Sequence, residues 1–418
     1  MRSIRFNFIM AVIAAVFFAG SIPAAFGADK VKIGVMYSLS GPGSVLGELQ
    51  MEGAKLAIQE INDAGGIKVG GKSMMIEGVY RDDETKPQVA IRRLKEMAQG
   101  KEVKILVGGT FGHVSMALNA ESKKTKVFLM TTNGVPEKFF EKKEKSATAL
   151  NIMATSESAG RGAAGYIAGP MKAKKIACFM PDYVIGQTTY TGFEAVIKDH
   201  AGIASEVFWV PVKTADMTPY LIKVKEYAPD VLFMGSWGGD AINALKATNE
   251  MGLAKDLKIF HFWLANVFAT GIPAEAMAGI WGQMFWYWDM TGFKDPEVVA
   301  ATKAFSDKYI AAYKSPPDPY AMAAYAGIKE TARAISLSGE VDPKKMYTAL
   351  MAAPEWTGPK GKASWRVDGR PVYKYATYIV EGKGPDQRSG QHTKYDYARI
   401  IDAYEGESFL PPVEDLGY

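Results

Sequence analysis

Two glycine-rich segments have residue types that bind phosphate in other proteins. Gly66–Ser73 (GIKVGGKS) matches the P-loop pattern GxxxxGK[ST] at every fixed position. A P-loop follows a strand and opens a helix, so that the N–H groups of the helix face the phosphates. Here a predicted helix precedes the match and a predicted strand, Met74–Tyr80, follows it. Because this order is reversed, we interpret Gly66–Ser73 as a turn.

The second glycine-rich segment is Gly41–Gly47 (GPGSVLG), which follows a predicted strand and opens a predicted helix. Its GxGxxxG spacing departs from the GxGxxG of dinucleotide-binding loops. A ligand in an open α/β sheet lies beyond the carboxyl ends of the strands. We therefore expect this loop to line a ligand cleft without holding a nucleotide. A simple tight turn is the alternative.

Residues suited to catalysis or metal binding form no local motif in this chain. No GxSxG elbow is present, and no histidine has an acid or a second histidine at metal-ligand spacing. We therefore expect no metal and no cofactor, and nothing in these motifs supports an enzyme, although catalytic triads can be scattered along a chain. Cys178 is the only cysteine, and we expect it to be buried within a strand. The four histidines are His113, His200, His261 and His392.

Composition and charge restrict the class of protein. The 418 residues are 48% hydrophobic and 22% charged, which excludes a disordered or collagen-like chain. This length allows about two to three domains. The net charge is +4, and two of the positive charges, Arg2 and Arg5, lie in a segment that we expect to be removed. Such a weak positive balance argues against nucleic acid as a partner.

Residues 1–27 predict a secretory signal peptide. Two arginines precede the apolar run Phe8–Gly20, and Ala25–Gly27 offers small residues for cleavage before Ala28. An uncleaved anchor helix is the alternative, but the run is shorter than the ~20 residues that a membrane span needs. No cysteine follows it, which excludes a lipid anchor of the bacterial lipoprotein kind. We expect a periplasmic protein that is soluble after cleavage.

Apolar runs alternate with amphipathic stretches along the mature chain. Gly47–Ala64, for example, places apolar residues on one helical face. The order βαβα predicts a parallel sheet with helices on both faces. After Asn151 the same pattern restarts. The predicted strands are 31–37, 74–80, 105–107 and 127–130 in the first run, and 175–180, 207–210, 231–234 and 259–262 in the second.

The C-terminal third has a different pattern. Helices are predicted over 295–313, 319–337 and 343–351, followed by alternating antiparallel strands over 363–367 and 372–380. The polar tail after Gly382 predicts a loop-rich end. The fold class is therefore α/β, with two doubly wound parallel-sheet lobes between which the chain crosses more than once.

Seven segments, taken in order, resemble those of a known family. The chain is similar to type I periplasmic substrate-binding proteins of ABC importers, of the branched-chain amino acid (Leu/Ile/Val-binding) type. Each motif is weak alone, but their order is specific and the resemblance covers the whole mature chain. The segments are Lys32–Pro42 (KIGVMYSLSGP), Gly53–Gly66 (GAKLAIQEINDAGG), Asp82-Asp83, Val107–Gly109, Thr131-Thr132, Asp182–Gly186 (DYVIG), and Pro319-Tyr320 with Ala324-Tyr325.

The resemblance implies two lobes joined by a three-segment hinge, with a ligand cleft that closes between them. Crossings are expected near Asn151, Trp286–Asp289 and Trp356–Lys362. Lobe 1 then comprises 28–150 plus 288–358, and lobe 2 comprises 151–287 plus 359–418. The implied partners are a small-molecule ligand and the membrane permease of an ABC importer. The absence of a heptad seam favours a monomer.

The resemblance also implies which residues contact the ligand. The family holds the ligand carboxylate at the loop that is Thr110–Ser115 here, which suits an anion because it opens a helix. The usual serine hydroxyl is replaced by Gly112 or His113. The residues implied for the site are Ser40, Leu46, Phe111, Gly112, His113, Val114, Thr132, Asn133 and Gly134 from lobe 1, and Tyr183, Ile185, Trp237 and Leu264 from lobe 2.

Leu264 marks a departure from the amino-acid binders, which place an acid at this position to pair with the ligand ammonium. A buried ammonium without a counter-charge is costly. Aromatic residues beside the site, such as Trp237 and Phe111, favour an aromatic or apolar body. We therefore expect a small organic acid. An amino acid paired with Asp182 or Asp240, a ligand-sensing subunit of a signalling receptor, and an exported hydrolase are the alternatives.

Overall fold

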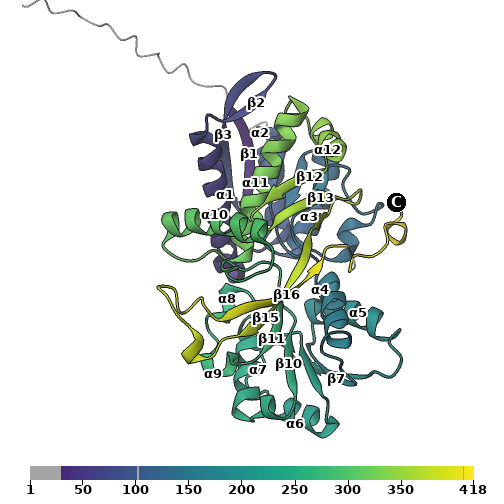
Figure 1. Cartoon of the computed structure of the whole chain (residues 1–418). Coiled ribbons are helices and arrows are strands. Elements are labelled where there is room, and N and C mark those ends of the chain that lie inside the picture. The colour runs from purple at the N-terminus through teal and green to yellow at the C-terminus, as the bar shows by residue number, and fades with distance from the viewer. Residues whose placement is uncertain (1–29, 101–102, 408) are drawn as a thin grey trace, which may run out of the picture.

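The computed structural model describes residues 30–100, 103–407 and 409–418. The predicted signal peptide therefore lies outside the described residues. Within those ranges no helix has the length and apolar character needed to cross a bilayer. The elements form two lobes, one above the other in Figure 1, each built on its own sheet.

The upper lobe contains a six-stranded sheet in the order β2-β3-β1-β4-β5-β6. All neighbouring strands are parallel except β2 and β3. Ile105 and Val107 pack under α1 and α11, whereas Leu106 packs under α2 and α3, so helices cover both faces. The elements are β1 (Lys30–Tyr37), α1 (Ser44–Asp63), β2 (Ile67–Val69), β3 (Lys72–Asp82), α2 (Pro87–Gly100), β4 (Ile105–Gly108), α3 (Gly112–Thr125), β5 (Phe128–Thr131), β6 (Ala149–Asn151), α10 (Pro296–Tyr313), α11 (Pro319–Ser338) and α12 (Pro343–Ala352).

The lower lobe contains a seven-stranded sheet in the order β16-β15-β11-β10-β9-β7-β8. Five strands are parallel, and β15 and β16 extend one side of the sheet as antiparallel strands. The predicted α/β class with two doubly wound lobes is confirmed. The elements are α4 (Ser156–Ala168), β7 (Lys175–Pro181), α5 (Val184–Ile197), β8 (Ala204–Val210), α6 (Thr218–Tyr227), β9 (Val231–Met234), α7 (Gly238–Glu250), β10 (Lys258–His261), α8 (Asn266–Ala269), α9 (Ala274–Met277), β11 (Trp281–Met284), β15 (Tyr375–Gly382) and β16 (Ala398–Glu405).

A small sheet lies between the lobes in sequence and packs on the upper one. It comprises β12 (Glu355–Gly358), β13 (Gly361–Trp365) and β14 (Pro371–Tyr373). The indole Nε1 of Trp365 donates to Glu330 Oε2 of α11 at 2.8 Å. The chain enters the lower sheet at Tyr375, after the predicted crossing at Trp356–Lys362. The other two passages between sheets lie between β6 and α4 and between β11 and α10.

Three local expectations can be compared directly with the structure. The P-loop match is a β2–β3 hairpin whose turn residues, Gly70 and Gly71, have φ of 55° and 82°, so it is a turn as predicted. Cys178 is fully buried in β7, also as predicted, and its burial raises the pKa of the thiol. The prediction of a loop-rich tail after Gly382 was wrong in part, because this tail contains β16, which pairs with β15.

Candidate functional site

The loops that follow β1 and β4 are packed against each other. The backbone N–H of Ser38 donates to Thr110 Oγ1 at 2.9 Å. A Cβ placed on Gly43 would lie 2.4 Å from the ring of Phe111, so only glycine lets the first loop approach this ring. A Cβ on Gly47 would lie 1.8 Å from the Ser38 carbonyl oxygen. These contacts bring the Ser40 loop beside Phe111, and the family resemblance assigns both segments to one site.

Two acids at the end of β3 hold the first loop. Ser40 Oγ donates to Asp82 Oδ2 at 2.6 Å, and Ser38 Oγ donates to Asp83 Oδ1 at 2.5 Å. Burial raises the pKa of Asp83 although Ser38 and Thr85 donate to it. At Asp82 the effect of burial is outweighed by donors from Ser40, Glu84 and Leu39, so its pKa is lowered. Both carboxylates are therefore engaged in shaping the loop.

The loop after β5 is fixed by buried polar contacts. Thr132 Oγ1 lies 3.0 Å from the hydroxyl of Tyr37, and Gln50 Nε2 donates to the Thr132 carbonyl at 3.1 Å. Asn133 Oδ1 accepts from Ser115 Oγ of α3 at 2.9 Å. Thr132 and Asn133 are at most 1% exposed. In this conformation they position the loop and the start of α3.

Three helices that begin just after parallel strands have an aromatic residue at the N-cap. Phe111 precedes α3, Tyr183 precedes α5 and Trp237 precedes α7, each with extended backbone dihedrals. Among the described residues, none of these three caps accepts a hydrogen bond through its side chain. The N–H groups of each first turn and the positive end of the helix dipole are thus free to attract an anion. In contrast, side chains cap α4, α10, α11 and α12, through Thr155, Asp295, Asp318 and Asp342.

The first turn of α11 joins the two lobes. Asp318 Oδ2 accepts from the backbone N–H of Val267 at 2.9 Å, and Asn266 Nδ2 donates to the Pro317 carbonyl at 2.9 Å. Burial raises the pKa of Tyr320, and the charges of Asp318 and of Tyr183 in the other lobe raise it further. The site prediction omitted Tyr320, although Pro319-Tyr320 was among the segments carrying the family resemblance.

The predicted site residues separate by exposure. Those on accessible surface are Ser40, Phe111, Gly112, His113, Gly134, Tyr183, Ile185 and Trp237. Those that are buried are Leu46, Val114, Thr132, Asn133 and Leu264. The ring of His113 stacks on Phe111 at 5.9 Å between centroids, and its Nε2 lies 3.3 Å from the Thr85 carbonyl oxygen. Trp237 packs edge-to-face on Phe268 at 5.6 Å.

Leu264 occupies the core of the lower lobe, whereas the sequence placed it on the cleft wall. It is fully buried, and a Cβ on Gly282 of β11 would lie 2.9 Å from its Cδ1. Its backbone N–H donates to the Gln283 carbonyl at 2.9 Å. The backbone of Leu264 is thus paired with β11 and its side chain is buried in this structure, and its contact with the ligand stays a prediction.

The two acids considered as substitute ammonium partners already have partners. Both oxygens of Asp240 accept from the backbone N–H of Lys213 at 3.1 Å. Asp182 is exposed, and its Oδ1 accepts from Gln187 Nε2 at 3.1 Å. Each carboxylate therefore supports its own loop at the surface. Across the described ranges, no three His, Cys, Asp or Glu side chains gather as a metal ion would require.

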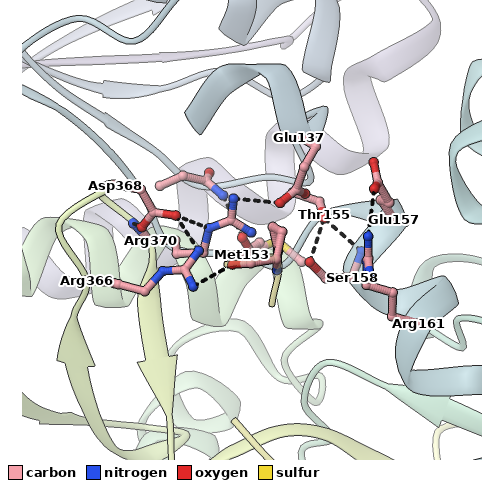
Figure 2. Close-up of polar contacts among 11 residues, drawn as sticks. Glu137, Met153, Thr155, Glu157, Ser158, Arg161, Arg366, Asp368 and Arg370 are labelled. Carbon is pink, nitrogen blue, oxygen red and sulfur yellow. Dashed lines mark hydrogen bonds and ion pairs between the residues drawn. The ribbon is translucent and has the colours of Figure 1, made fainter. Parts of the chain in front are cut away.

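Buried arginine and acidic side chains form an ion network around the β13–β14 turn (Figure 2). Arg370 contacts Glu137 Oε1 at 2.6 Å and Asp368 Oδ2 at 2.7 Å. Arg366 contacts Asp368 Oδ2 at 2.6 Å and donates to the Pro411 carbonyl at 2.9 Å. The network connects the loop after β5, the β13–β14 turn and the C-terminal segment. A cavity of about 40 Å³ adjoins it and is lined by residues of α4, β14, β15 and the C-terminal segment.

Comparisons with known proteins agree with this geometry. Residues 30–386 match the family model described as periplasmic binding protein. A leucine-, isoleucine-, valine-, threonine- and alanine-binding protein of Pseudomonas aeruginosa is 24% identical over 341 residues, covering 81% of this chain and 87% of the relative.

Solved structures share the fold. A branched-chain amino acid ABC transporter ligand-binding protein of Burkholderia xenovorans has a TM-score of 0.81 at 20% identity, covering 92% of this chain and 98% of that one. A solute-binding protein of an ABC transporter from Rhodopseudomonas palustris, solved with benzoate, has a TM-score of 0.71 at 20% identity, covering 90% and 97%. With its two doubly wound lobes and its match to the family model over residues 30–386, the chain belongs to the periplasmic binding protein family.

Proposed function

We propose that the protein captures a small organic acid, an aromatic or apolar carboxylate, between its lobes and delivers it to the permease of an ABC importer. It would act in the periplasm as a monomer, after removal of residues 1–27. The observation that carries this proposal is the set of helix starts at Phe111, Tyr183 and Trp237. Each combines free N–H donors with an aromatic side chain, and these groups suit the two halves of an aromatic carboxylate.

The state of the nearby acids supports a ligand without an ammonium group. Asp82, Asp83, Asp240 and Asp318 all accept hydrogen bonds from loops or helix starts of the protein itself. An ammonium ion would have to compete with these donors or remain without a counter-charge, which is costly in a closed site. A carboxylate instead meets donors that are free.

The alternative is a branched-chain or other amino acid as ligand. It is supported by the names of the relatives, several of which are called Leu/Ile/Val-binding protein homologues. One structural neighbour from Streptococcus pneumoniae was solved with isoleucine, whereas two from Rhodopseudomonas palustris were solved with benzoate and 3,4-dihydroxybenzoic acid. The family thus accommodates both ligand classes on one fold.

A titration of two tryptophan variants tests where the ligand binds. We expect Trp237→Ala to weaken benzoate binding at least about tenfold, because an aromatic contact and its buried area are lost. Trp209→Ala is the control, since Trp209 is a partly exposed tryptophan of β8 that packs on Tyr190. Equal benzoate affinity in the two variants would refute a site at the start of α7.

A further inference from the structure

A second cavity lies on the upper lobe, between α10, α11 and β12. Its volume is about 250 Å³, and its lining is aromatic on one side, with Phe305, Tyr325 and Trp356, and basic at Lys308 and Lys329. None of these residues belongs to the site proposed above. We propose that this cavity is a separate binding site for a small aromatic carboxylate, and the inference does not depend on the proposed function.

The aromatic lining provides surface for a planar ring. Phe305 and Tyr325 lie 4.7 Å apart between ring centroids. Trp356 is held against Trp365 by stacking at 5.8 Å and against Tyr373 by an edge contact at 5.7 Å. Because these rings are fixed by their neighbours, a planar ligand would meet a surface that needs little reorganisation.

The charges around the cavity leave one cation in excess. Lys308 and Lys329 both contact the same oxygen of Glu60, at 3.1 and 2.9 Å. Glu60 lies behind these lysines, and the acid in the lining itself, Glu330, is already paired with Arg333 at 2.7 Å. Two ammonium groups therefore share one carboxylate, and each ammonium has three donors. A ligand carboxylate would balance the charge and use the donors that remain.

Glu60 stays ionised throughout the physiological range. Burial acts to raise its pKa, but donors from Tyr325, Lys329 and Lys308 outweigh it and lower the pKa to about 2. The excess positive charge at the cavity therefore comes from the second lysine and does not come from protonation of Glu60. Anion binding there should vary little between pH 6 and pH 8.

Trp356 contributes its ring to the wall of the cavity. The residue is only 7% exposed, and its Nε1–H is itself buried, so this donor does not face the open space. The cavity thus combines an aromatic wall with an excess cation.

The test uses the mature chain with 4-fluorobenzoate followed by ¹⁹F NMR. Ala304 is an exposed residue of α10 that lines the cavity, so Ala304→Trp fills the cavity without disturbing the core. Ala312→Trp places the same side chain on an exposed position of the same helix and is the control. Both variants are made in the Trp237→Ala background, which weakens binding at the proposed interlobe site.

We expect the Ala304→Trp variant to bind 4-fluorobenzoate at least about tenfold more weakly than the Ala312→Trp variant. Lys308→Met should weaken binding in the same direction, and neutral 4-fluorobenzamide should bind worse than the carboxylate. Equal binding by the two tryptophan variants, or equal binding of the amide and the carboxylate, would overturn the inference. Failure of the proposed function would appear differently, as a Trp237→Ala substitution without effect on the total binding.

Discussion

The carboxylate of Asp318 accepts a hydrogen bond from the backbone N–H of Val267 at 2.9 Å, joining α11 of one lobe to α8 of the other. Asp318 also caps α11 by accepting from the N–H of Tyr320 at 3.0 Å. It is 1% exposed. Burial raises its pKa to about 6, although the backbone N–H groups of Tyr320, Val267 and Asn266 oppose the shift.

This shift predicts a pH-dependent stability difference between the wild type and Asp318→Asn. Because the pKa is higher in the folded state than in the unfolded chain, the folded state binds the proton more tightly. The resulting stabilisation is complete below about pH 4 and is lost as the pH rises through about 6. At about 1.4 kcal/mol per pKa unit, Asp318 then contributes roughly 3 kcal/mol less to the free energy of unfolding.

Urea denaturation of both proteins between pH 4 and pH 8 measures this difference. The unfolding free energy of the wild type relative to Asp318→Asn should fall between pH 4 and pH 6 and stay constant above pH 7. A difference in unfolding free energy that is constant over the whole range, or that increases with pH, would contradict the raised pKa of Asp318.

Gly47 should not tolerate alanine, because α1 packs directly on the loop that carries Ser38 and Ser40. The added methyl group would lie 1.8 Å from the Ser38 carbonyl oxygen, so the loop or the helix must shift. Such overpacking costs about 1–3 kcal/mol, more than alanine gains through helix propensity. Thermal unfolding of Gly47→Ala should show this loss.

Gly100→Ala is the matched control for this substitution. Gly100 is the exposed last residue of α2, and no described atom lies within 4 Å of the added methyl group. The Gly100→Ala variant should be as stable as the wild type or slightly more stable. If both variants unfold at the wild-type temperature, the close packing of α1 on the first loop is incorrect.

Arg370 should be important for stability, because it is the centre of the ion network around the β13–β14 turn. It is 3% exposed and pairs with Glu137 and with Asp368, which is fully buried. Arg370→Met keeps much of the side-chain volume but leaves Glu137 without its cation and Asp368 with Arg366 alone, and breaking such a buried pair costs about 3–5 kcal/mol. Arg399→Met removes an exposed pair with Glu381 and should cost less than about 1 kcal/mol. Denaturant titration gives the free energy of unfolding of both variants. An equal loss in the two variants would contradict the ion network around Arg370.

The parallel strands could be predicted from the sequence because they are buried on both faces. Val231–Met234 and Ile105–Gly108, for example, are buried at every position and appear as continuous apolar runs. Trp281–Met284 was missed because its short run includes Gly282 and Gln283. Gln283 is nonetheless fully buried, since its Nε2 donates to the Ala159 carbonyl of α4 at 2.7 Å. That partner lies far away in the sequence.

The site was predictable where loops follow strands and was less so elsewhere. Phe111 and Trp237 were identified because each stands between an apolar strand and a helix. The roles of Asp318 and Tyr320 depend on the approach of α11 to the other lobe, which no local pattern reveals. The burial of Leu264 depends on its packing against Gly282 of a strand that the sequence did not predict.

Isothermal titration of the mature chain tests whether the proposed interlobe site accepts a carboxylate without an ammonium group. Benzoate and 3,4-dihydroxybenzoate would be compared with L-leucine and L-isoleucine, each also in the Trp237→Ala variant. We expect an aromatic acid to bind and Trp237→Ala to weaken that binding, with leucine and isoleucine binding at least about a hundredfold more weakly. Tight binding of leucine or isoleucine with no binding of either aromatic acid would rule out the proposed ligand class.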